Sequence, residues 1–366
     1  MKIETTLEKI KDAISRVQKV SSKNLSLPIL ENVLLVAKEK NLTLRSTNLH
    51  VGVEVTIPVK VKTEGEIAIK LDVFGQIINS LGNEHVVVLE VIDNTLHITT
   101  EKSQMDIKLF PHSDFPTLPH IEEGETLKIP IETIIDGVRS VVYSASLSDI
   151  KPEISSVYIY TENNELVFVS TDSFRLAEKR IVVDTNIDVE GLIVPVKNIQ
   201  ECIKVFSGIT GDVEVNLGKN QLSIQSDTIY FTSRIIDGNY PDYKQIIPQE
   251  SETQAIVLKD ELIQSLRLIN VFSDNFNQLS LQVDAKKGQI LLHSRNTDVG
   301  ENKTSVDAAV TGKNIEMYLN HKYLSDAFPV LGSDSIQFSF IEKNKPCVIR
   351  SVGDSSFLYL IMPMNR

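Results

Sequence analysis

Three weakly similar copies of one pattern follow each other along the chain, about 125 residues apart. In each copy an apolar segment with strand character leads into a Thr-Asn or Thr-Asp pair, and a second such segment follows. The threonines of these pairs are Thr47, Thr171 and Thr297, at separations of 124 and 126 residues. Solenoid units run to roughly 50 residues. Each longer copy is therefore expected to bury a core and form a domain of its own.

Other segments recur in the same register and support the repeat. Helical patterns begin near Thr6, Ile129 and Ile256, and we expect a helix to open each third of the chain. Strand-then-helix patterns begin near Gly65, Gly191 and Lys313. Proline and charge accumulate near residues 120 and 247, which predicts domains at 1–120, 121–247 and 248–366.

The strands of each copy alternate apolar and polar residues, as in Val51, Val53, Val55 and Ile57. Turn signals at 38–41, 161–165 and 286–289 predict hairpins between successive strands. Two helices per copy, with most strands in hairpins, indicate the α+β class. We expect antiparallel sheets with the helices on one face.

Composition indicates the cellular compartment of the protein and the kind of nucleic-acid binding to expect. The N-terminal segment is charged and lacks the apolar core of a signal peptide, and no apolar run is long enough to cross a bilayer. The two cysteines, Cys202 and Cys347, form no disulfide framework. We therefore expect a cytoplasmic protein. The formal net charge of −12 argues against tight, non-specific nucleic-acid binding unless the charge is unevenly distributed.

The motifs of common enzymes do not occur. None of the seven histidines stands in a metal-binding HExxH or Cys/His pattern, and GxGxxG, GxxxxGK[ST] and GxSxG are missing. We expect no cofactor and no metal. A hydrolase using Asp172 and a neighbouring serine stays open as an alternative. The other copies place Asn48 and Asp298 at this position, however, and Asn or Asp after Thr at a strand end is typical of an Asx turn.

Basic residues concentrate on the helical segments, while acidic residues gather in the segments between domains. This distribution indicates an acidic shell with basic helical faces, suited to surrounding a polyanion without gripping it. The residues expected to face this polyanion are Lys9, Lys11, Arg16, Lys19, Lys23, Arg139, Lys197, Lys204, Arg267 and Lys322.

Four short stretches carry a resemblance to a known family. They are LPIL at 27–30, STDSFRLAEKR at 170–180, YPDY at 240–243 and the closing YLIMPMNR. Together with the three copies and the length, they make the chain similar, end to end, to the β subunit of bacterial DNA polymerase III, the sliding clamps. Besides the hydrolase, an adaptor unrelated to DNA is a further alternative.

The resemblance implies a non-catalytic ring: a head-to-tail homodimer of three repeated domains per chain, with helices inside and antiparallel sheets outside. The ring would encircle duplex DNA without sequence preference and act as a processivity factor. Helices about 10 Å apart support the dimer, since six enclose about 19 Å across their axes and twelve about 38 Å. Only the larger circle admits a duplex.

The family's partner site is a cleft for short peptides between the second and third domains. Expected partners are the polymerase α subunit, the clamp-loader δ subunit, other polymerases and repair proteins, and no membrane. We expect Arg175 to pair with a polar or acidic group at the rim. The implied cleft residues are Ile154, Thr171, Ser173, Phe174, Arg175, Leu176, Pro241, Gln245, Ile246, Asn320, Tyr323, Met362, Pro363 and Met364.

The chain departs from the family pattern at three of these positions. Ser173 replaces a frequent glycine, Phe174 a frequent histidine and Gln245 a frequent arginine. The implied dimer seam joins an edge strand at Gln104, Met105 and Ile107 to the helix region at Val271 and Phe272 of the other chain. Met105 stands where the family often has phenylalanine.

Overall fold

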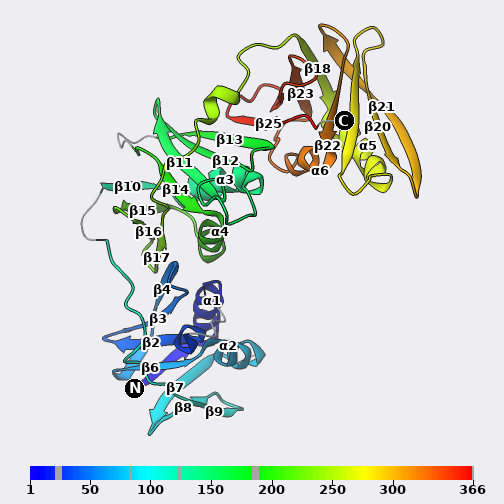
Figure 1. Cartoon of the computed structure of the whole chain (residues 1–366). Helices are drawn as coiled ribbons and strands as arrows, with labels where there is room; N and C mark the ends of the chain where they lie inside the picture. Colours follow the sequence, from blue (N-terminus) through cyan, green and yellow to red (C-terminus); the bar gives the residue numbers. More distant parts are fainter. Residues whose placement is uncertain (21–26, 83, 122–124, 184–188, 365–366) are drawn as a thin grey trace. The chain divides into compact units, whose positions relative to one another are not determined.

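The computed structural model describes residues 1–20, 27–82, 84–121, 125–183 and 189–364. Its helices and strands are labelled in Figure 1, and its internal contacts divide the chain into two compact units. Unit 1 comprises Met1–Thr133 with Lys197–Ile235, and unit 2 comprises Ile134–Val196 with Ile236–Arg366. Among the described residues no helix is both long and apolar enough to cross a membrane.

Six α-helices of the described residues form within the segments that the periodicity predicted. In α1 the buried residues include Leu7, Ile10, Ile14 and Val17, the spacing of an amphipathic helix with one face on a sheet. The helices are α1 (Leu7–Val17), α2 (Leu71–Ser80), α3 (Ile131–Val141), α4 (Val196–Val205), α5 (Lys259–Val271) and α6 (His321–Asp326).

The expectation that a helix opens each third is wrong. A short strand comes first each time, and the helix begins at the residue that follows the strand. These strands are β1 (Lys2–Thr6), β10 (Glu125–Pro130) and β18 (Thr253–Leu258). They were missed because each is only five or six residues long and merges with the apolar pattern of the helix.

Unit 1 contains two antiparallel sheets, and α1 packs against β3, β4 and α2. The first sheet has the order β5 (Lys60–Thr63), β1, β7 (Val86–Ile92), β8 (Thr95–Thr99) and β9 (Gln104–Lys108). The second has the order β10, β15 (Asp212–Leu217), β16 (Gln221–Gln225), β17 (Ile229–Arg234), β4 (Val51–Pro58), β3 (Asn41–Thr47), β2 (Asn32–Lys38) and β6 (Gly65–Lys70).

Unit 2 is built on one sheet of 12 strands, and α5 packs against β20, β21 and α6. The order is β14 (Leu192–Pro195), β11 (Ser156–Glu162), β12 (Glu165–Thr171), β13 (Arg175–Val182), β25 (Phe357–Ile361), β24 (Cys347–Ser351), β23 (Ser335–Phe340), β18, β21 (Gly300–Thr311), β20 (Gln289–Asn296), β19 (Gln278–Asp284) and β22 (Ile315–Asn320).

The predicted hairpin turns are confirmed. Glu39, Asn163, Asn164 and Gly288 occupy them with positive φ values of 57°, 53°, 62° and 64°. A two-residue hairpin loop needs this left-handed backbone to match the twist of its strands. Asparagine and glycine tolerate it best.

Both larger sheets run from one copy of the repeat into the next. In unit 1, β4 of the first copy pairs with β17 of the second, with Val53 opposite Phe231. In unit 2, β13 of the second copy pairs with β25 of the third, with Ala177 opposite Tyr359. The two junctions therefore join equivalent strands of successive copies.

Candidate protein-docking site

The turn at 171–175 is closed by its own polar side chains. The Thr171 hydroxyl donates to the Arg175 carbonyl at 2.6 Å and accepts from the Ser173 N–H at 3.1 Å. One oxygen of Asp172 accepts from the N–H groups of Phe174 and Arg175, and the other accepts from Arg175 Nε at 3.0 Å. Asp172 is thus an Asx-turn residue whose two oxygens are occupied, which removes it as the base of the hydrolase alternative.

The first copy has the same turn. The Thr47 hydroxyl donates to the Val51 carbonyl at 2.8 Å, and Asn48 Oδ1 accepts from the N–H of Val51. In the third copy the expected role of Asp298 is wrong: the accepting side chain is Asn296, which takes the Asp298 N–H at 2.9 Å. The loop that follows Asn296 is one residue longer than in the other copies. Matching Thr297 to Thr47 and Thr171 therefore placed the third copy two positions out of register.

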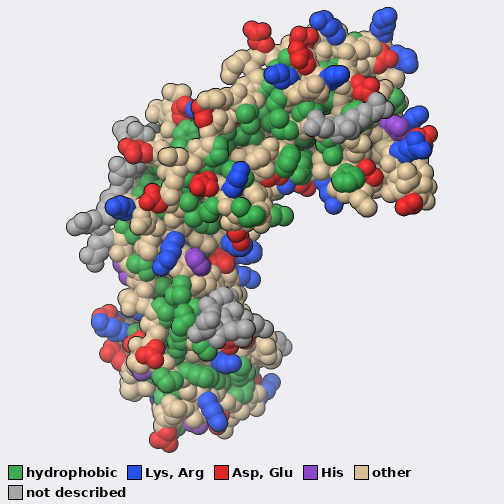
Figure 2. Space-filling model, in the orientation of Figure 1, with side chains coloured by type: hydrophobic (Ala, Val, Ile, Leu, Met, Phe, Trp, Pro, Cys, Tyr) green, Lys and Arg blue, Asp and Glu red, His purple; other side chains and the backbone are tan. Residues whose placement is uncertain are grey.

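The C-terminal tail, residues 362–364, fastens this turn to the third copy. The Met362 N–H donates to the Phe174 carbonyl at 2.8 Å, and the Met364 N–H donates to the Tyr318 carbonyl of β22 at 2.8 Å. The tail therefore spans from the β12–β13 turn to an edge strand. Hydrophobic side chains gather on the surface over β13 and β25 (Figure 2).

Arg175 joins the turn to α6. Its Nη1 donates to Asp326 at 2.5 Å, and its guanidinium carbon lies 4.3 Å from the centre of the Tyr323 ring. Both acids that pair with Arg175 belong to this chain, and the expected pairing with a group at the rim of the cleft stays a prediction. An Arg–carboxylate pair stacked on an aromatic ring is a strong, oriented contact.

The start of α6 is fixed by two further bonds. The Asn320 side chain caps the helix by accepting from the N–H groups of Lys322 and Tyr323. The Tyr359 hydroxyl of β25 donates to the Tyr323 carbonyl at 2.8 Å. These bonds set the position of the ring on which Arg175 stacks.

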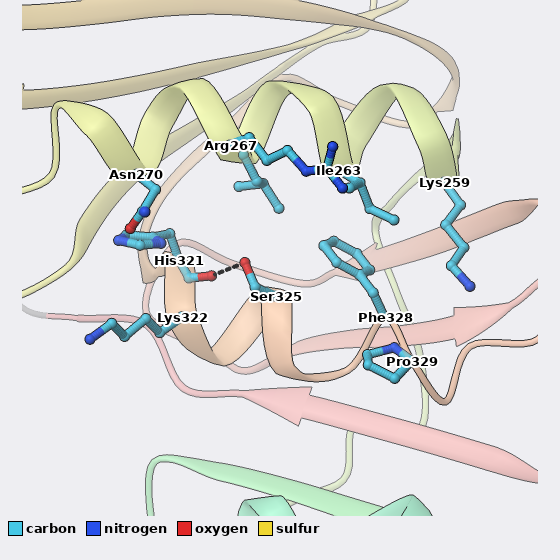
Figure 3. Close-up of a pocket in the computed structure, with 10 residues that line it drawn as sticks. Lys259, Ile263, Arg267, Asn270, His321, Lys322, Ser325, Phe328 and Pro329 are labelled. Carbon is cyan, nitrogen blue, oxygen red and sulfur yellow. Dashed lines mark hydrogen bonds between the residues drawn. The ribbon is translucent and has the colours of Figure 1, made fainter.

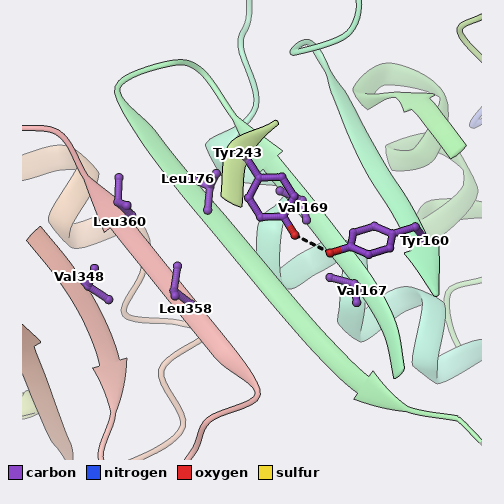
Figure 4. Close-up of a cluster of buried hydrophobic side chains, with 8 residues drawn as sticks. All are labelled: Tyr160, Val167, Val169, Leu176, Tyr243, Val348, Leu358 and Leu360. Atoms are coloured by element: carbon purple, nitrogen blue, oxygen red, sulfur yellow. Dashed lines mark hydrogen bonds between the residues drawn. The ribbon is translucent and has the colours of Figure 1, made fainter. Parts of the chain in front are cut away.

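A buried apolar cluster holds the short 3-10 helix η3 (Tyr243–Ile246) against β13 and β25 (Figure 4). Tyr240, Ile247 and Met362 pack against this cluster from its edge. Its members are Tyr160, Val167, Val169, Leu176, Tyr243, Val348, Leu358 and Leu360.

Around this core, apolar side chains stay open to solvent. Phe174 is 62% exposed and Ile246 is 43% exposed, while Met362, Pro363 and Met364 are half-buried. Exposed apolar groups beside a rigid core are typical of a surface that binds another protein. We call the turn at 171–175, the tail, η3 and the start of α6 the docking surface.

The docking surface contains most of the predicted cleft residues. Leu176 lies in its buried cluster, and Pro241 and Gln245 are exposed around η3. Ile154 is half-buried in the loop before β11, where its carbonyl accepts the Ser146 N–H at 2.9 Å. Its part in the site stays a prediction.

The predicted DNA-facing residues divide into two groups. Lys11 donates to the Leu81 carbonyl at 2.8 Å, just after α2, and Arg16 donates to the carbonyl of Val205, the last residue of α4, at 2.5 Å. These two cations hold helices of unit 1 in place. Lys23 lies outside the described residues. The exposed group is Lys9, Lys19, Arg139, Lys197, Lys204, Arg267 and Lys322.

A groove of about 570 Å3 lies between the exposed sides of α5 and α6 (Figure 3). Ile263, Leu266 and Phe328 give it an apolar lining, and Arg267 and Lys322 bring cations from opposite helices. The ten residues that line the groove include no acid. It therefore offers positive charge along this helical face.

The predicted seam residues occupy an edge strand and a helix end. Gln104, Met105 and Ile107 lie on β9, which pairs with β8 on one side only among the described residues. Val271, 61% exposed, ends α5, and the Phe272 ring lies beside Gly300 at the start of β21.

Comparisons with known proteins cover the chain from end to end. Three models of the DNA polymerase III beta subunit match it: the N-terminal domain at residues 1–119, the central domain at 128–242 and the C-terminal domain at 244–365. It is 26% identical to the beta sliding clamp of Bacillus subtilis over 100% of both chains. It is also 26% identical to that of Synechococcus elongatus, over 100% of this chain and 99% of the relative.

Solved structures agree with the fold. The DNA polymerase sliding clamp of Bacillus subtilis matches with a TM-score of 0.94 at 25% identity, over 100% of this chain and 99% of that one. The DNA polymerase III beta subunit of Thermotoga maritima matches with a TM-score of 0.94 at 23% identity, over the same shares. With family models matched to all three parts of its length, the chain belongs to the DNA polymerase III beta subunit family.

Proposed function

We propose that this chain is a sliding clamp of DNA replication. It is a non-catalytic processivity factor in which two copies close head to tail around duplex DNA and tether the replicative polymerase. Its three domains are 1–120, 121–247 and 248–366, and it works in the cytoplasm. The proposal rests on two open strand edges, one in the first copy of the repeat and one in the third. They correspond to the two strands that pair at each of the junctions between successive copies.

Equivalent pairings identify these two strands. Phe231, Tyr359 and Met105 each pair with an isoleucine of the preceding strand, namely Ile224, Ile349 and Ile98. β9 of the first copy is therefore the counterpart of β17 and β25. Unlike them, β9 has no second strand partner among the described residues.

The second of these strands is β21. Val53, Ala177 and Asn302 each pair with a buried serine, namely Ser46, Ser170 and Ser294. Residues 300–307 of β21 pair with β20 alone, so their other edge is unfilled in the described part of the chain. The open edges of β9 and β21 are suited to pair with those of a second copy, in the same manner as the strands at the two junctions within the chain.

The two junctions within the chain also give the register. Val53 faces Phe231 and Ala177 faces Tyr359, so Met105 should face Asn302 of the partner subunit. The variant Met105→Cys/Asn302→Cys should form a covalent dimer under mild oxidation. Met105→Cys/Lys303→Cys is the matched control and should not, because a shift of one residue turns the side chain to the other face. Equal cross-linking of both variants would refute this junction.

DNA contact is assigned to the exposed cations on the helices. Sequence-blind attraction to phosphates is weak and salt-dependent, which permits sliding once the ring is closed. The decisive experiment loads the labelled protein onto nicked circular DNA with the clamp loader of the same organism. Retention on the circle and release after linearisation are expected. A protein that is never retained after loading is not a clamp.

The docking surface is assigned to short peptides of the partner proteins. Its apolar groups and adaptable methionines suit a site that serves several partners. Deleting residues 362–366 should abolish peptide binding while the dimer persists, because the deletion removes the two bonds from the tail to Phe174 and Tyr318. Unchanged peptide affinity would remove the docking assignment and leave the DNA function standing.

A further inference from the structure

The 3-10 helix η3 is attached to the sheet through a buried hydroxyl. Tyr243 Oη donates to Glu178 Oε2 at 2.5 Å and lies 2.7 Å from Tyr160 Oη. A phenol carries one proton, so Tyr160 is the donor in the second bond. Glu178 is only 7% exposed, and Tyr243 only 5%.

The second attachment of η3 uses the adjacent residue. Lys244 Nζ donates to Glu162 Oε1 at 2.6 Å and lies 5.2 Å from the centre of the Tyr160 ring. Arg180 then closes a circuit, because its Nε donates to Glu178 at 2.7 Å and its Nη2 donates to Glu162 at 2.9 Å. The closed circuit comprises Tyr160, Tyr243, Glu178, Arg180, Glu162 and Lys244. We call it the polar ring.

η3 has little stability of its own. It contains four residues, and the Asp242 side chain does not cap its start. A helix this short keeps its place through contacts with the rest of the protein. Two attachments at consecutive residues fix its rotation as well as its position. The exposed side chains of Gln245 and Ile246 follow directly from that placement.

We propose that the polar ring positions the η3 wall of the docking surface, with Tyr243 as a positioning residue for partner-peptide binding. The inference rests on the proposed docking function. The ring lies on β11, β13 and η3, and its members Glu162, Glu178 and Arg180 are outside the docking surface. Peptide affinity therefore depends on Glu162, Glu178 and Arg180, which lie outside the docking surface.

The test begins with labelled 15-residue peptides that tile the replicative polymerase α subunit of the same organism. The tightest binder is then titrated into the full-length dimer at 25 °C. Tyr243→Phe leaves Glu178 without one buried donor and should weaken binding about 3- to 30-fold. Glu178→Met combined with Tyr243→Phe should weaken it far less than the product of the single effects, because each change alone already removes the Tyr243–Glu178 bond.

Tyr158→Phe is the matched control. This tyrosine also lies on β11 and packs on the same cluster, but within the described ranges its hydroxyl has no hydrogen bond in the structure. The variant should bind the peptide within about twofold of the parent, since it loses no buried bond.

Hydrogen exchange of the free dimer separates this inference from the docking proposal. In Tyr243→Phe the Ile247 amide, which donates to the Lys244 carbonyl at 3.2 Å, should exchange at least about tenfold faster, while amides of β12 stay unchanged. If no peptide binds the parent protein, the docking proposal fails. Hydrogen exchange still decides whether the polar ring positions η3. Unchanged affinity and exchange in Tyr243→Phe, even with a lower melting temperature, would overturn the inference.

Discussion

Arg175 and Tyr323 join the second and third copies of the repeat through one stacked pair. The guanidinium carbon lies 4.3 Å from the ring centre, and the same group is bonded to Asp172 and Asp326. The side chain of Arg175 is only 10% exposed. One largely buried cation thus connects the β12–β13 turn with α6.

Replacing Arg175 with alanine should lower the free energy of unfolding by about 3 kcal/mol, because two carboxylates lose their partner and Tyr323 loses its stack. Arg175→Lys should recover only part of this loss, because it keeps the positive charge but not the planar stacking on Tyr323. Urea unfolding followed by fluorescence measures both changes. Arg295→Ala, on an exposed position of β20, serves as the control and should cost under about 0.5 kcal/mol.

Ser173 and Leu49 occupy equivalent turns with φ values of 76° and 72°. Glycine adopts this left-handed backbone without steric cost. Ser173→Gly and Leu49→Gly should therefore each stabilise the fold, by up to about 1 kcal/mol. Ser305→Gly on β21 should instead destabilise it, since glycine weakens a strand. Calorimetry comparing the three variants would contradict the turn geometry if all three lost stability.

Gly137 lies on α3 where a Cβ would come within 2.2 to 2.5 Å of the Phe168 ring. Alanine normally stabilises a helix relative to glycine. At this position the overlap should reverse the sign, and Gly137→Ala should cost about 1–3 kcal/mol. Gly82→Ala should be nearly neutral, because a Cβ there would meet no described atom within 4 Å apart from its chain neighbours. Equal melting temperatures for the two variants would show that α3 can move away from β12.

Glu201 links the first copy to α4 by accepting a hydrogen bond from Asn48 Nδ2 at 3.1 Å. Burial raises the pKa of Glu201 to about 7 from the ordinary 4.5, against the opposing effects of Asn48 and Lys204. The folded state therefore holds this proton more tightly, so stability falls as pH rises from 4.5 to about 7 and then levels off.

Glu201→Gln keeps an acceptor for Asn48 and removes the charge. It should stabilise the protein by about 1 kcal/mol at pH 8, a figure reduced for partial exposure of the group, and by almost nothing at pH 4.5. Urea titrations at the two pH values measure the difference. Glu214→Gln, at an exposed position, is the control. An equal stabilisation by Glu201→Gln at both pH values would contradict the raised pKa of Glu201.

Local features of the fold could be predicted from sequence because each depends on a few neighbouring residues. The helical patterns, the hairpin turns at Asn163 and Gly288, and the Asx turn at Asp172 belong to this class. The docking residues were assigned by resemblance, and the structure adds the bonds that hold them, from Thr171 to the tail.

Features that depend on distant residues could not be predicted in the same way. The junctions at Val53–Phe231 and Ala177–Tyr359 join strands far apart in the chain, and no local pattern encodes such a pairing. Lys11 and Arg16 were predicted to face DNA, because their carbonyl partners lie on other elements that the local sequence does not reveal. One missed signal was present: Ser46, Ser170 and Ser294 recur at 124 residues and would have aligned the third copy on Asn296.

The pairing of β25 between β13 and β24 has a mechanical consequence for the tail that follows it. A pull on the tail along the axis of β25 loads the hydrogen bonds of both neighbouring strands in parallel. Bonds loaded together in shear resist far more force than bonds opened one after another from an end. Tension applied near Met362 is thus carried into the middle of the 12-stranded sheet.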